Sequence, residues 1–202
     1  MISMTDSKIN SILDEGNRLF LQGKLKEAIE YYDKILENNP QHISSLNNKG
    51  YALSKLKDFE NAMKCYDAAL EVSPNDISVI VNKISSFRKQ GNFSHALVLC
   101  EKLLDKNPKY NIALYHKERI LFSMNKFDES ILCCNSILED YPGNGDVLFD
   151  KSSNLVMLSQ IDEALDLLEH AISQGIQYKI KAKKSKLFEK LSENSRFQKL
   201  IS

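Results

Sequence analysis

A fixed 34-residue step runs through most of this 202-residue chain and limits what it can fold into. Prolines mark the step at Pro40, Pro74, Pro108 and Pro142. Small residues repeat at a second position of the same period: Ala28, Ala62, Ala96, Ser130 and Ala164. A period of this length is typical of stacked structural units, none of which can bury its apolar face alone. We therefore expect one continuous stack of similar units.

Each period shows the pattern of two short amphipathic helices. In the first period, Ala28, Ile29, Tyr32 and Ile35 lie at helical spacing within a predicted helix over 25–38. The helix before it is expected to run to about residue 21, with Asp6 or Ser7 as its N-cap and Gly23 in the tight turn that follows. Pro40 prevents the second helix from continuing. The pattern predicts an all-α fold of helix-turn-helix units.

The repeat resembles the tetratricopeptide repeat family, whose signature places leucine, glycine and an aromatic in the first helix and alanine, an aromatic and proline in the second. The best match consists of Leu46, Lys49, Gly50, Leu53, Ala62, Tyr66 and Pro74. The resemblance implies a right-handed α-solenoid of five tetratricopeptide repeats over 9–178. Their bounds are 9–42, 43–76, 77–110, 111–144 and 145–178, after a flexible N-terminus over 1–8 and before C-terminal capping helices over 179–202.

Close helix contact explains the small residues of the pattern. Gly50 and Ala62 allow the paired helices to approach, and Tyr66 fills the space toward the next unit. Ile84 and Glu118 occupy the position of Gly50 in later units. A buried, unpaired carboxylate is costly, so we expect Glu118 to be paired or tilted toward water.

The tail over 179–202 begins like a sixth first helix, with Ile180, Leu187 and Leu191 at helical spacing. A short final helix is expected to bury Phe197, Leu200 and Ile201, because terminal repeats shield the last open face. Five lysines precede it: Lys179, Lys181, Lys183, Lys184 and Lys186. They are read either as a solvated helix face or as a patch for an acidic partner or phosphate.

Composition argues for a cytoplasmic protein that does not bind nucleic acid. Lysines and arginines number 27, as do aspartates and glutamates, whereas phosphate neutralisation needs a basic excess. No apolar run approaches the roughly 20 residues of a membrane span, and no signal peptide is recognised, so no membrane partner is expected. The four cysteines fall in helical pattern without metal-ligand spacing, which favours reduced, packed thiols.

No catalytic constellation is found in the sequence, which predicts a protein that is not an enzyme and needs no cofactor. The four histidines fall in different units, and the chain lacks a nucleophile elbow, a phosphate-binding glycine loop and a zinc-protease motif. Asp146 and Asp150 lie one helical turn apart, as paired catalytic carboxylates can. We interpret them as solvated charges.

In the tetratricopeptide repeat family, the first helix of each unit lines a concave groove that binds extended peptides. Applied by register, the resemblance selects a candidate partner-binding groove made of Asn17, Asn47, Asn48, Tyr51, Lys55, Asn82, Arg88, Lys89, Tyr115, His116, Arg119, Phe122 and Phe149. Its middle is basic and its far end aromatic. The asparagine amides can both donate to and accept from a peptide backbone. The alternative is a merely solvated polar groove.

Some family members clamp a C-terminal carboxylate with lysines, asparagines and an arginine. Asn17 and Asn48 match that clamp, but Leu13, Ser78 and Asn82 stand where its cations would be, which argues against this mode.

The leading hypothesis is a scaffold that binds an acidic or extended peptide segment of a protein partner, with an apolar anchor near Phe122. The alternative is a self-associating, homo-oligomeric structural protein that uses the apolar groove end or the terminal caps. RNA reading by helical repeats is disfavoured by zero net charge and by the varied residues at the slot of Asn48.

Overall fold

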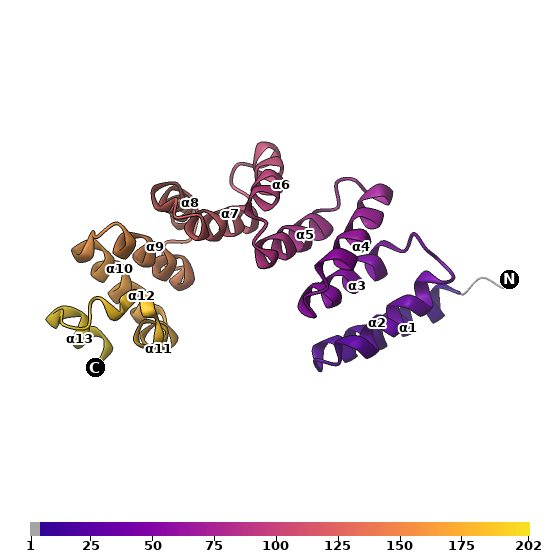
Figure 1. Ribbon diagram of the computed structural model, residues 1–202, viewed down its shortest axis with the longest axis horizontal. Helices are drawn as coiled ribbons and strands as arrows, with labels where there is room; N and C mark the ends of the chain where they lie inside the picture. Colours follow the sequence, from indigo (N-terminus) through magenta and orange to yellow (C-terminus); the bar gives the residue numbers. More distant parts are fainter. Residues whose placement is uncertain (1–4) are drawn as a thin grey trace. The chain divides into compact units, whose positions relative to one another are not determined.

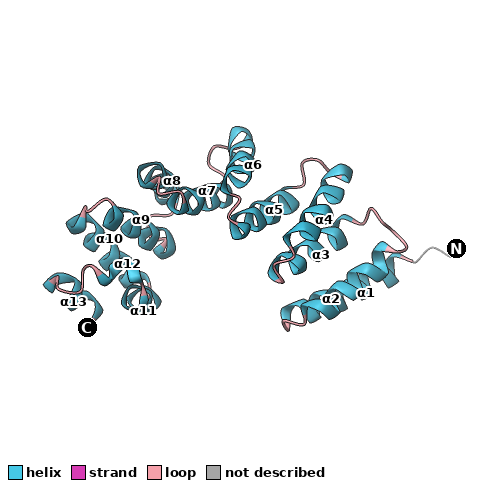
Figure 2. Cartoon of the chain, viewed as in Figure 1, coloured by secondary structure: helices cyan, strands magenta, loops and turns pink. Residues whose placement is uncertain are grey.

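The computed structural model describes residues 5–202, which form helices and no strand (Figure 2). The chain divides into two compact units, residues 1–99 and 100–202. Unit 1 contains α1 (Asp6–Leu21), α2 (Leu25–Leu36), α3 (Ile43–Lys55), α4 (Phe59–Val72) and α5 (Ile77–Gln90) (Figure 1). The division falls within α6 (Phe93–Lys106). Each unit is described below by itself.

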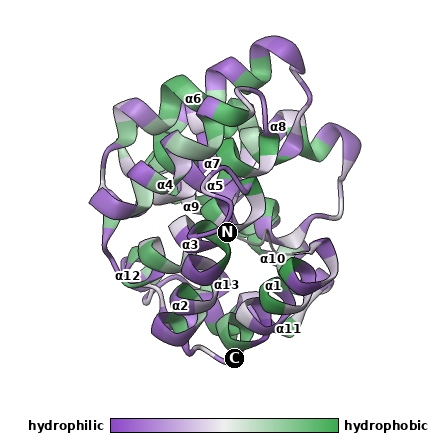
Figure 3. Cartoon of the chain, turned by 90° about the vertical axis from the view of Figure 1, so that its right-hand side faces the viewer, coloured by the Kyte–Doolittle hydropathy of each residue, from purple (hydrophilic) through white to green (hydrophobic). Residues whose placement is uncertain are grey.

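Unit 2 begins within α6 and contains seven further helices. They are α7 (Asn111–Ser123), α8 (Phe127–Asp140), α9 (Gly145–Met157), α10 (Ile161–Gln174), α11 (Ile176–Lys184), α12 (Lys186–Glu189) and α13 (Ser195–Ile201). Hydrophilic and hydrophobic residues share individual helices, as amphipathic packing requires (Figure 3). The all-α solenoid class predicted from the repeat is confirmed.

Some of the helices, among them α5, α9 and α13, begin where a short polar side chain accepts backbone hydrogen bonds. Asp76 Oδ1 accepts from the backbone N–H groups of Ser78 and Val79, and Asn144 and Asn194 cap α9 and α13 in the same manner. The predicted cap of the first helix is wrong: α1 begins at Asp6, and Thr5 precedes it without a side-chain cap bond. Residues 1–4 of the segment expected to be flexible lie outside the described residues.

The turn inside each helix pair repeats the 34-residue step in the backbone. Residues with left-handed φ occur at Gly23, Lys57, Gly91, Asn125 and Ser159, with φ between 59° and 79°. Only glycine adopts this region without steric cost, so Gly23 fits the turn predicted there. The three other residues adopt the same conformation because the two helices they join fix the turn.

Helix pairs approach closely at the predicted glycine. A Cβ atom added to Gly50 would lie 2.8 Å from Cε1 of Tyr66, and one added to Gly16 would lie 2.8 Å from Cε1 of Tyr32. Both tyrosine rings are fully buried. The prediction that Gly50 permits close approach is confirmed, and the tyrosine lies against the glycine of its own pair.

A lysine on the first helix of a pair joins the second helix of the preceding pair. Lys49 Nζ lies 2.5 Å from Asp33 Oδ1, Lys83 pairs with Asp67, and Lys117 Nζ lies 3.4 Å from Glu101 Oε1. In each of these three ion pairs the two residues are 16 positions apart in the sequence. Successive ion pairs are separated by the 34-residue step. Asn135 stands where the next acid would be, and Lys151 lies instead 3.9 Å from Glu163.

The tail differs from its prediction in which residues it buries. Its first helix begins at Ile176 and ends at Lys184, and its buried residues are Tyr178 and Ala182. Ile180 is exposed, contrary to the predicted apolar face, because the helix is rotated to place Tyr178 against α9 and α10. Phe188 and Phe197 stack with ring centroids 5.8 Å apart in the core of unit 2, which confirms the burial of Phe197. Leu187, Leu200 and Ile201 are partly buried against that core.

Candidate functional site

The predicted groove residues lie on the first helices of the pairs, and all are partly or fully exposed. In unit 1 they are Asn17 on α1, Asn47, Asn48, Tyr51 and Lys55 on α3, and Asn82, Arg88 and Lys89 on α5. In unit 2 they are Tyr115, His116, Arg119 and Phe122 on α7, and Phe149 on α9. Each unit therefore presents its own candidate surface.

Asparagines join neighbouring first helices in unit 1. Asn48 Nδ2 donates to Asn17 Oδ1 at 2.8 Å, and that oxygen also accepts from the Tyr32 hydroxyl at 3.0 Å. One step along, Asn82 Nδ2 donates to Asn47 Oδ1 at 3.0 Å. An amide has two N–H groups and two acceptor lone pairs, so these bonds use part of its capacity. The asparagines hold the helices in register and retain donors and acceptors for a ligand.

Tyr51 is surrounded by an aromatic ring and two cations. The Phe20 centroid lies 5.2 Å from that of Tyr51, and the Nζ atoms of Lys55 and Lys89 lie 5.5 Å and 5.4 Å from it. Burial lowers the pKa of Lys89, and the positive charges of Lys55 and Arg88 lower it further. Neither Lys55 nor Lys89 forms an ion pair with another residue in 5–202. The two lysines therefore concentrate positive charge around Tyr51 without an ion-pair partner in the described part of the chain.

A pocket of about 210 Å³ opens beside this cluster. It is lined by Asn17, Phe20, Leu21, Tyr32, Asn48 and Tyr51. Burial raises the pKa of Tyr32 to about 12, so its hydroxyl remains a neutral hydrogen-bond donor. We call Lys55, Lys89 and this pocket the Tyr51 site. Its chemistry suits an apolar side chain next to a carboxylate.

Sequence reasoning selected Asn17, Asn48 and Tyr51 of this pocket but missed Tyr32. The repeat pattern assigns Tyr32 to the core, and its ring is indeed buried against Gly16. Tyr32 nevertheless lines the pocket, and its hydroxyl donates to Asn17 Oδ1, which the sequence pattern cannot show.

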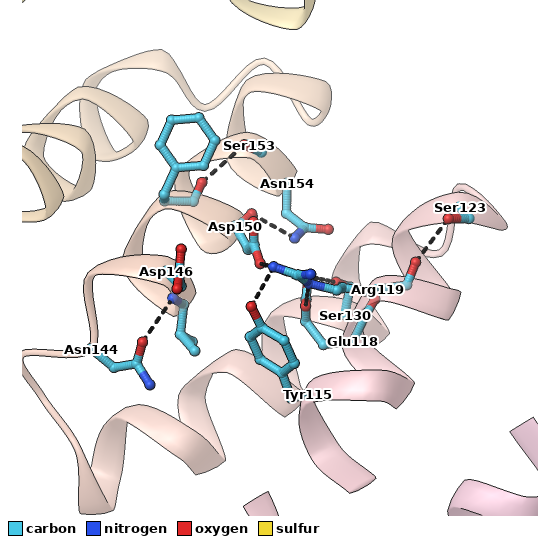
Figure 4. A network of polar contacts seen from close by, with 12 residues as sticks. Tyr115, Glu118, Arg119, Ser123, Ser130, Asn144, Asp146, Asp150, Ser153 and Asn154 are labelled. Carbon is cyan, nitrogen blue, oxygen red and sulfur yellow. Dashed lines mark hydrogen bonds and ion pairs between the residues drawn. The ribbon is translucent and has the colours of Figure 1, made fainter. Parts of the chain in front are cut away.

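In unit 2, Arg119 is the centre of a polar network between α7 and α9 (Figure 4). Its Nη2 and Nε atoms lie 3.0 Å and 3.3 Å from Asp150 Oδ2. It also donates a hydrogen bond to the Tyr115 hydroxyl and lies 4.1 Å from the centroid of that ring. Burial raises the pKa of Tyr115 to about 12, against the opposing influence of Arg119.

The interpretation as a solvated charge is wrong for Asp150, whereas Asp146, whose side chain is 46% exposed, is a solvated charge that also forms an ion pair. The Asp150 side chain is only 22% exposed and is paired with Arg119. Burial raises the pKa of Asp150, and the positive charge and hydrogen bonds of Arg119 oppose that rise. Asp146 Oδ1 lies 2.7 Å from Lys181 Nζ. Because Asp150 compensates Arg119, this arginine does not contribute a free cation to the predicted basic middle.

Glu118 is buried and paired, as expected from its place in the repeat. The Ser130 hydroxyl donates to the Glu118 backbone carbonyl at 3.1 Å and lies 3.4 Å from its Oε1. The guanidinium of Arg119 lies 3.9 Å from its Oε2. These contacts compensate the carboxylate at a position where other units place a glycine, an isoleucine or a serine.

The aromatic residues of unit 2 are partly used in packing. Phe122 meets Phe127 edge to face, with centroids 5.5 Å apart. The ring centroids of Phe149 and Phe188 are 5.6 Å apart. Lys181 Nζ lies over the Phe149 ring, 5.6 Å from its centroid. A separate pocket of about 320 Å³ is lined by Asn111, Ile112, Tyr115, Ile137, Tyr141 and Asn144. Tyr115 is the one member of the predicted groove that it contains.

Other chemistry is sparse within residues 5–202. No three His, Cys, Asp or Glu side chains gather there to hold a metal ion. The four cysteines are buried as free thiols, and burial raises the pKa of Cys133 to about 11. None of the helices in this range has the length and apolarity needed to cross a bilayer.

Two family models match overlapping parts of the chain. The model described as "Tetratricopeptide repeat protein 21 N-terminal ARM repeat" matches residues 5–131, and the model "Psidin, N-terminal TPR repeats region" matches residues 81–200.

Solved structures share the fold at low identity. A tetratricopeptide repeat protein from Parabacteroides merdae ATCC 43184 is 17% identical, with a TM-score of 0.75 over 98% of this chain and 84% of that one. MamA from Desulfovibrio magneticus RS-1, residue 41 to the end, is 17% identical, with a TM-score of 0.74 over 91% and 100%. YrrB, described as "a TPR protein with an unusual peptide-binding site", is 19% identical, with a TM-score of 0.65 over 86% and 91%.

Fold and sequence together define a helical-repeat protein whose first helices present exposed polar and aromatic faces. The chain belongs to the tetratricopeptide repeat family.

Proposed function

We propose that this protein is a non-enzymatic, cytoplasmic interaction scaffold that binds a peptide segment of a protein partner at the Tyr51 site. The carrying observation is the pair of lysines, Lys55 and Lys89, placed around one aromatic ring without a carboxylate partner among the residues that the structure describes. Helical repeats of this family generally serve as non-catalytic interaction scaffolds, and the resemblance to YrrB, itself described as peptide-binding, is consistent with this proposal. No cofactor is proposed.

The chemistry of the Tyr51 site selects an acidic segment with an apolar anchor. Two like charges close together repel each other, and the depressed pKa of Lys89 reflects burial and that repulsion. A bound carboxylate would relieve the repulsion while an apolar side chain fills the pocket lined by Phe20, Leu21 and Tyr51. The spare amide groups of Asn17 and Asn48 can hydrogen-bond the peptide backbone.

This placement moves the expected anchor away from Phe122. Phe122 lies against Phe127, and Arg119 next to it is neutralised by Asp150. In this proposal the cations and the apolar anchor that the sequence predicts for one peptide ligand are those of the Tyr51 site in unit 1, not those near Phe122.

Charge reversal tests the proposal. Peptides selected from a random display library on the wild-type protein would be titrated against Lys55→Glu/Lys89→Glu by fluorescence anisotropy. We expect Kd to rise at least about tenfold, which corresponds to about 1.4 kcal/mol. Lys8→Glu/Lys26→Glu, at two exposed positions of unit 1, changes the net charge equally and should leave Kd unchanged. Equal loss in both variants, or no loss in either, would refute the Tyr51 site.

A second candidate function, self-association, is favoured by the pocket in unit 2. Ile112 and Tyr141 at its lining are exposed apolar side chains, 47% and 55% accessible. A second copy could cover them. Sedimentation velocity over a wide concentration range would show a rising mass that Ile112→Ser removes, and a constant monomer would exclude this function.

A further inference from the structure

The helix α11 presents an apolar ridge to solvent. Its buried residues, Tyr178 and Ala182, are four apart and define the side that packs into unit 2. Ile176 and Ile180 are also four apart and lie on the opposite side, 64% and 47% exposed. Two isoleucines aligned on the outer side of a helix are not explained by packing within unit 2.

Lysines surround this ridge. Residues 176–202 contain seven lysines and one arginine against two glutamates, an excess of six positive charges in a chain of zero net charge. Lys181 is paired with Asp146, and Lys179 donates to the backbone carbonyl of Ser202. Lys183, Lys184 and Lys186 are exposed and form no ion pair with another residue in 5–202. Two of them, Lys183 and Lys184, lie one to two turns beyond Ile176 and Ile180 on the same outer side.

We propose that the outer face of α11 binds the surface of an anionic lipid bilayer. The isoleucine side chains would enter the boundary between headgroups and acyl chains, as the apolar side of an interfacial helix does. Lysine stems can lie along apolar surface while their ammonium groups remain with the anionic headgroups. Clusters of lysines on such a helix are typical of binding to acidic lipids.

The shape of this face favours a bilayer over an acidic protein. The exposed isoleucines lie opposite the buried side of α11, so their side chains form a ridge that projects from the helix into solvent. A flat, deformable surface accepts such a ridge directly, whereas a protein partner needs a matching groove. The sequence expectation of no membrane partner rests on the lack of a spanning segment, which concerns crossing and not surface contact.

Vesicle flotation tests this proposal. The protein would be mixed with vesicles of phosphatidylcholine alone, or with about 30% phosphatidylserine added as the anionic lipid. We expect binding to the anionic vesicles only, falling as salt rises from about 0.05 to about 0.3 M. Lys183→Glu/Lys184→Glu should lower the partition coefficient at least about tenfold, because each lysine near the bilayer surface contributes substantially to the electrostatic attraction to anionic lipid.

Two further variants separate the contributions. Ile180→Ser should weaken partitioning severalfold while leaving its salt dependence unchanged, because it removes apolar insertion and no charge. Lys8→Glu/Lys26→Glu, remote in sequence and equal in charge, should bind like the wild type. Circular dichroism would verify that each variant remains folded. Equal binding to neutral vesicles, unchanged binding of the α11 variants, or binding to poly-glutamate but not to vesicles would overturn the proposal.

Discussion

Asn48 donates a hydrogen bond from Nδ2 to Oδ1 of Asn17, 31 residues earlier in the chain and one helix pair away. The same oxygen accepts from Tyr32, so three helices meet at one acceptor. A second amide bond, from Asn82 to Asn47, joins the next two first helices through an acceptor at a different position of the repeat. These bonds make the asparagines structural ties as well as candidate ligand contacts.

Replacing Asn48 by Ala should therefore lower the free energy of unfolding by about 1 kcal/mol, the usual net contribution of one hydrogen bond. Asn10→Ala on the exposed side of α1 is the matched control, because it makes the same change in helix propensity without losing such a bond. Urea denaturation measures both. If Asn48→Ala is as stable as Asn10→Ala, the bond to Asn17 contributes nothing.

Gly50→Ala should destabilise the protein by about 1–3 kcal/mol despite the better helix propensity of alanine. The added methyl would meet the fully buried ring of Tyr66 at 2.8 Å. The chain suggests a compensating change, because Ser152 and Leu168 occupy the same two positions in a later pair. Gly50→Ser/Tyr66→Leu should cost less than the sum of its single changes. Additive losses in a double-mutant cycle would contradict the contact.

Lys57→Gly should raise the free energy of unfolding by about 0.5–1 kcal/mol. Lys57 has a φ of 65°, a region that costs non-glycine residues about 1–2 kcal/mol, partly offset by the greater freedom of glycine in the unfolded chain. Gly23→Ala at the equivalent turn is the converse control and should destabilise. Thermal melts compare the variants, and a lower melting temperature for Lys57→Gly would contradict the assignment.

Arg119→Ala should reduce stability near neutral pH by about 1–3 kcal/mol, since it leaves the Asp150 carboxylate half-buried without its partner. Burial raises the pKa of Asp150, so the folded state holds this proton more tightly than the unfolded state does. Stability is thereby lost as pH rises through the raised pKa. Loss of Arg119 raises that pKa further, so the deficit should shrink as pH falls toward the ordinary aspartate pKa of about 4.

The pH dependence of that deficit has its own control. Adding Asp150→Asn to Arg119→Ala removes the Asp150 carboxylate, so the deficit of the double variant should vary less with pH between about 4 and 7 than that of Arg119→Ala alone; the Glu118 carboxylate, 3.9 Å from Arg119, is left in both variants. A deficit in Arg119→Ala that stays constant over this range would mean that Asp150 does not depend on Arg119.

The sequence was sufficient for features that depend on position within one repeat. The 34-residue step predicts the helix pairs, and the close approach of Gly50 and the burial of the cysteines follow from their places in it. For Glu118 the step left two alternatives, a paired carboxylate or one tilted toward water, and the structure shows the first. Features that depend on where two helices meet were not predictable. From the sequence alone Asp150 is interpreted as solvated, because only the structure shows that Arg119 of α7 lies beside it. In the tail, two apolar stripes overlap, and only packing against α9 and α10 selects Tyr178 and Ala182 over Ile180.

The residues at the closest point of each helix pair vary together in size. Glycine faces tyrosine in the first two pairs, while glutamate with cysteine and serine with leucine occupy the same positions in later ones. If one helix were moved alone from one pair to another, its contact residue would be too large or too small for the contact residue of its new partner helix. The smallest transplantable piece of this chain is consequently the complete hairpin, and chimaeras spliced between pairs should fold where those spliced within a pair fail.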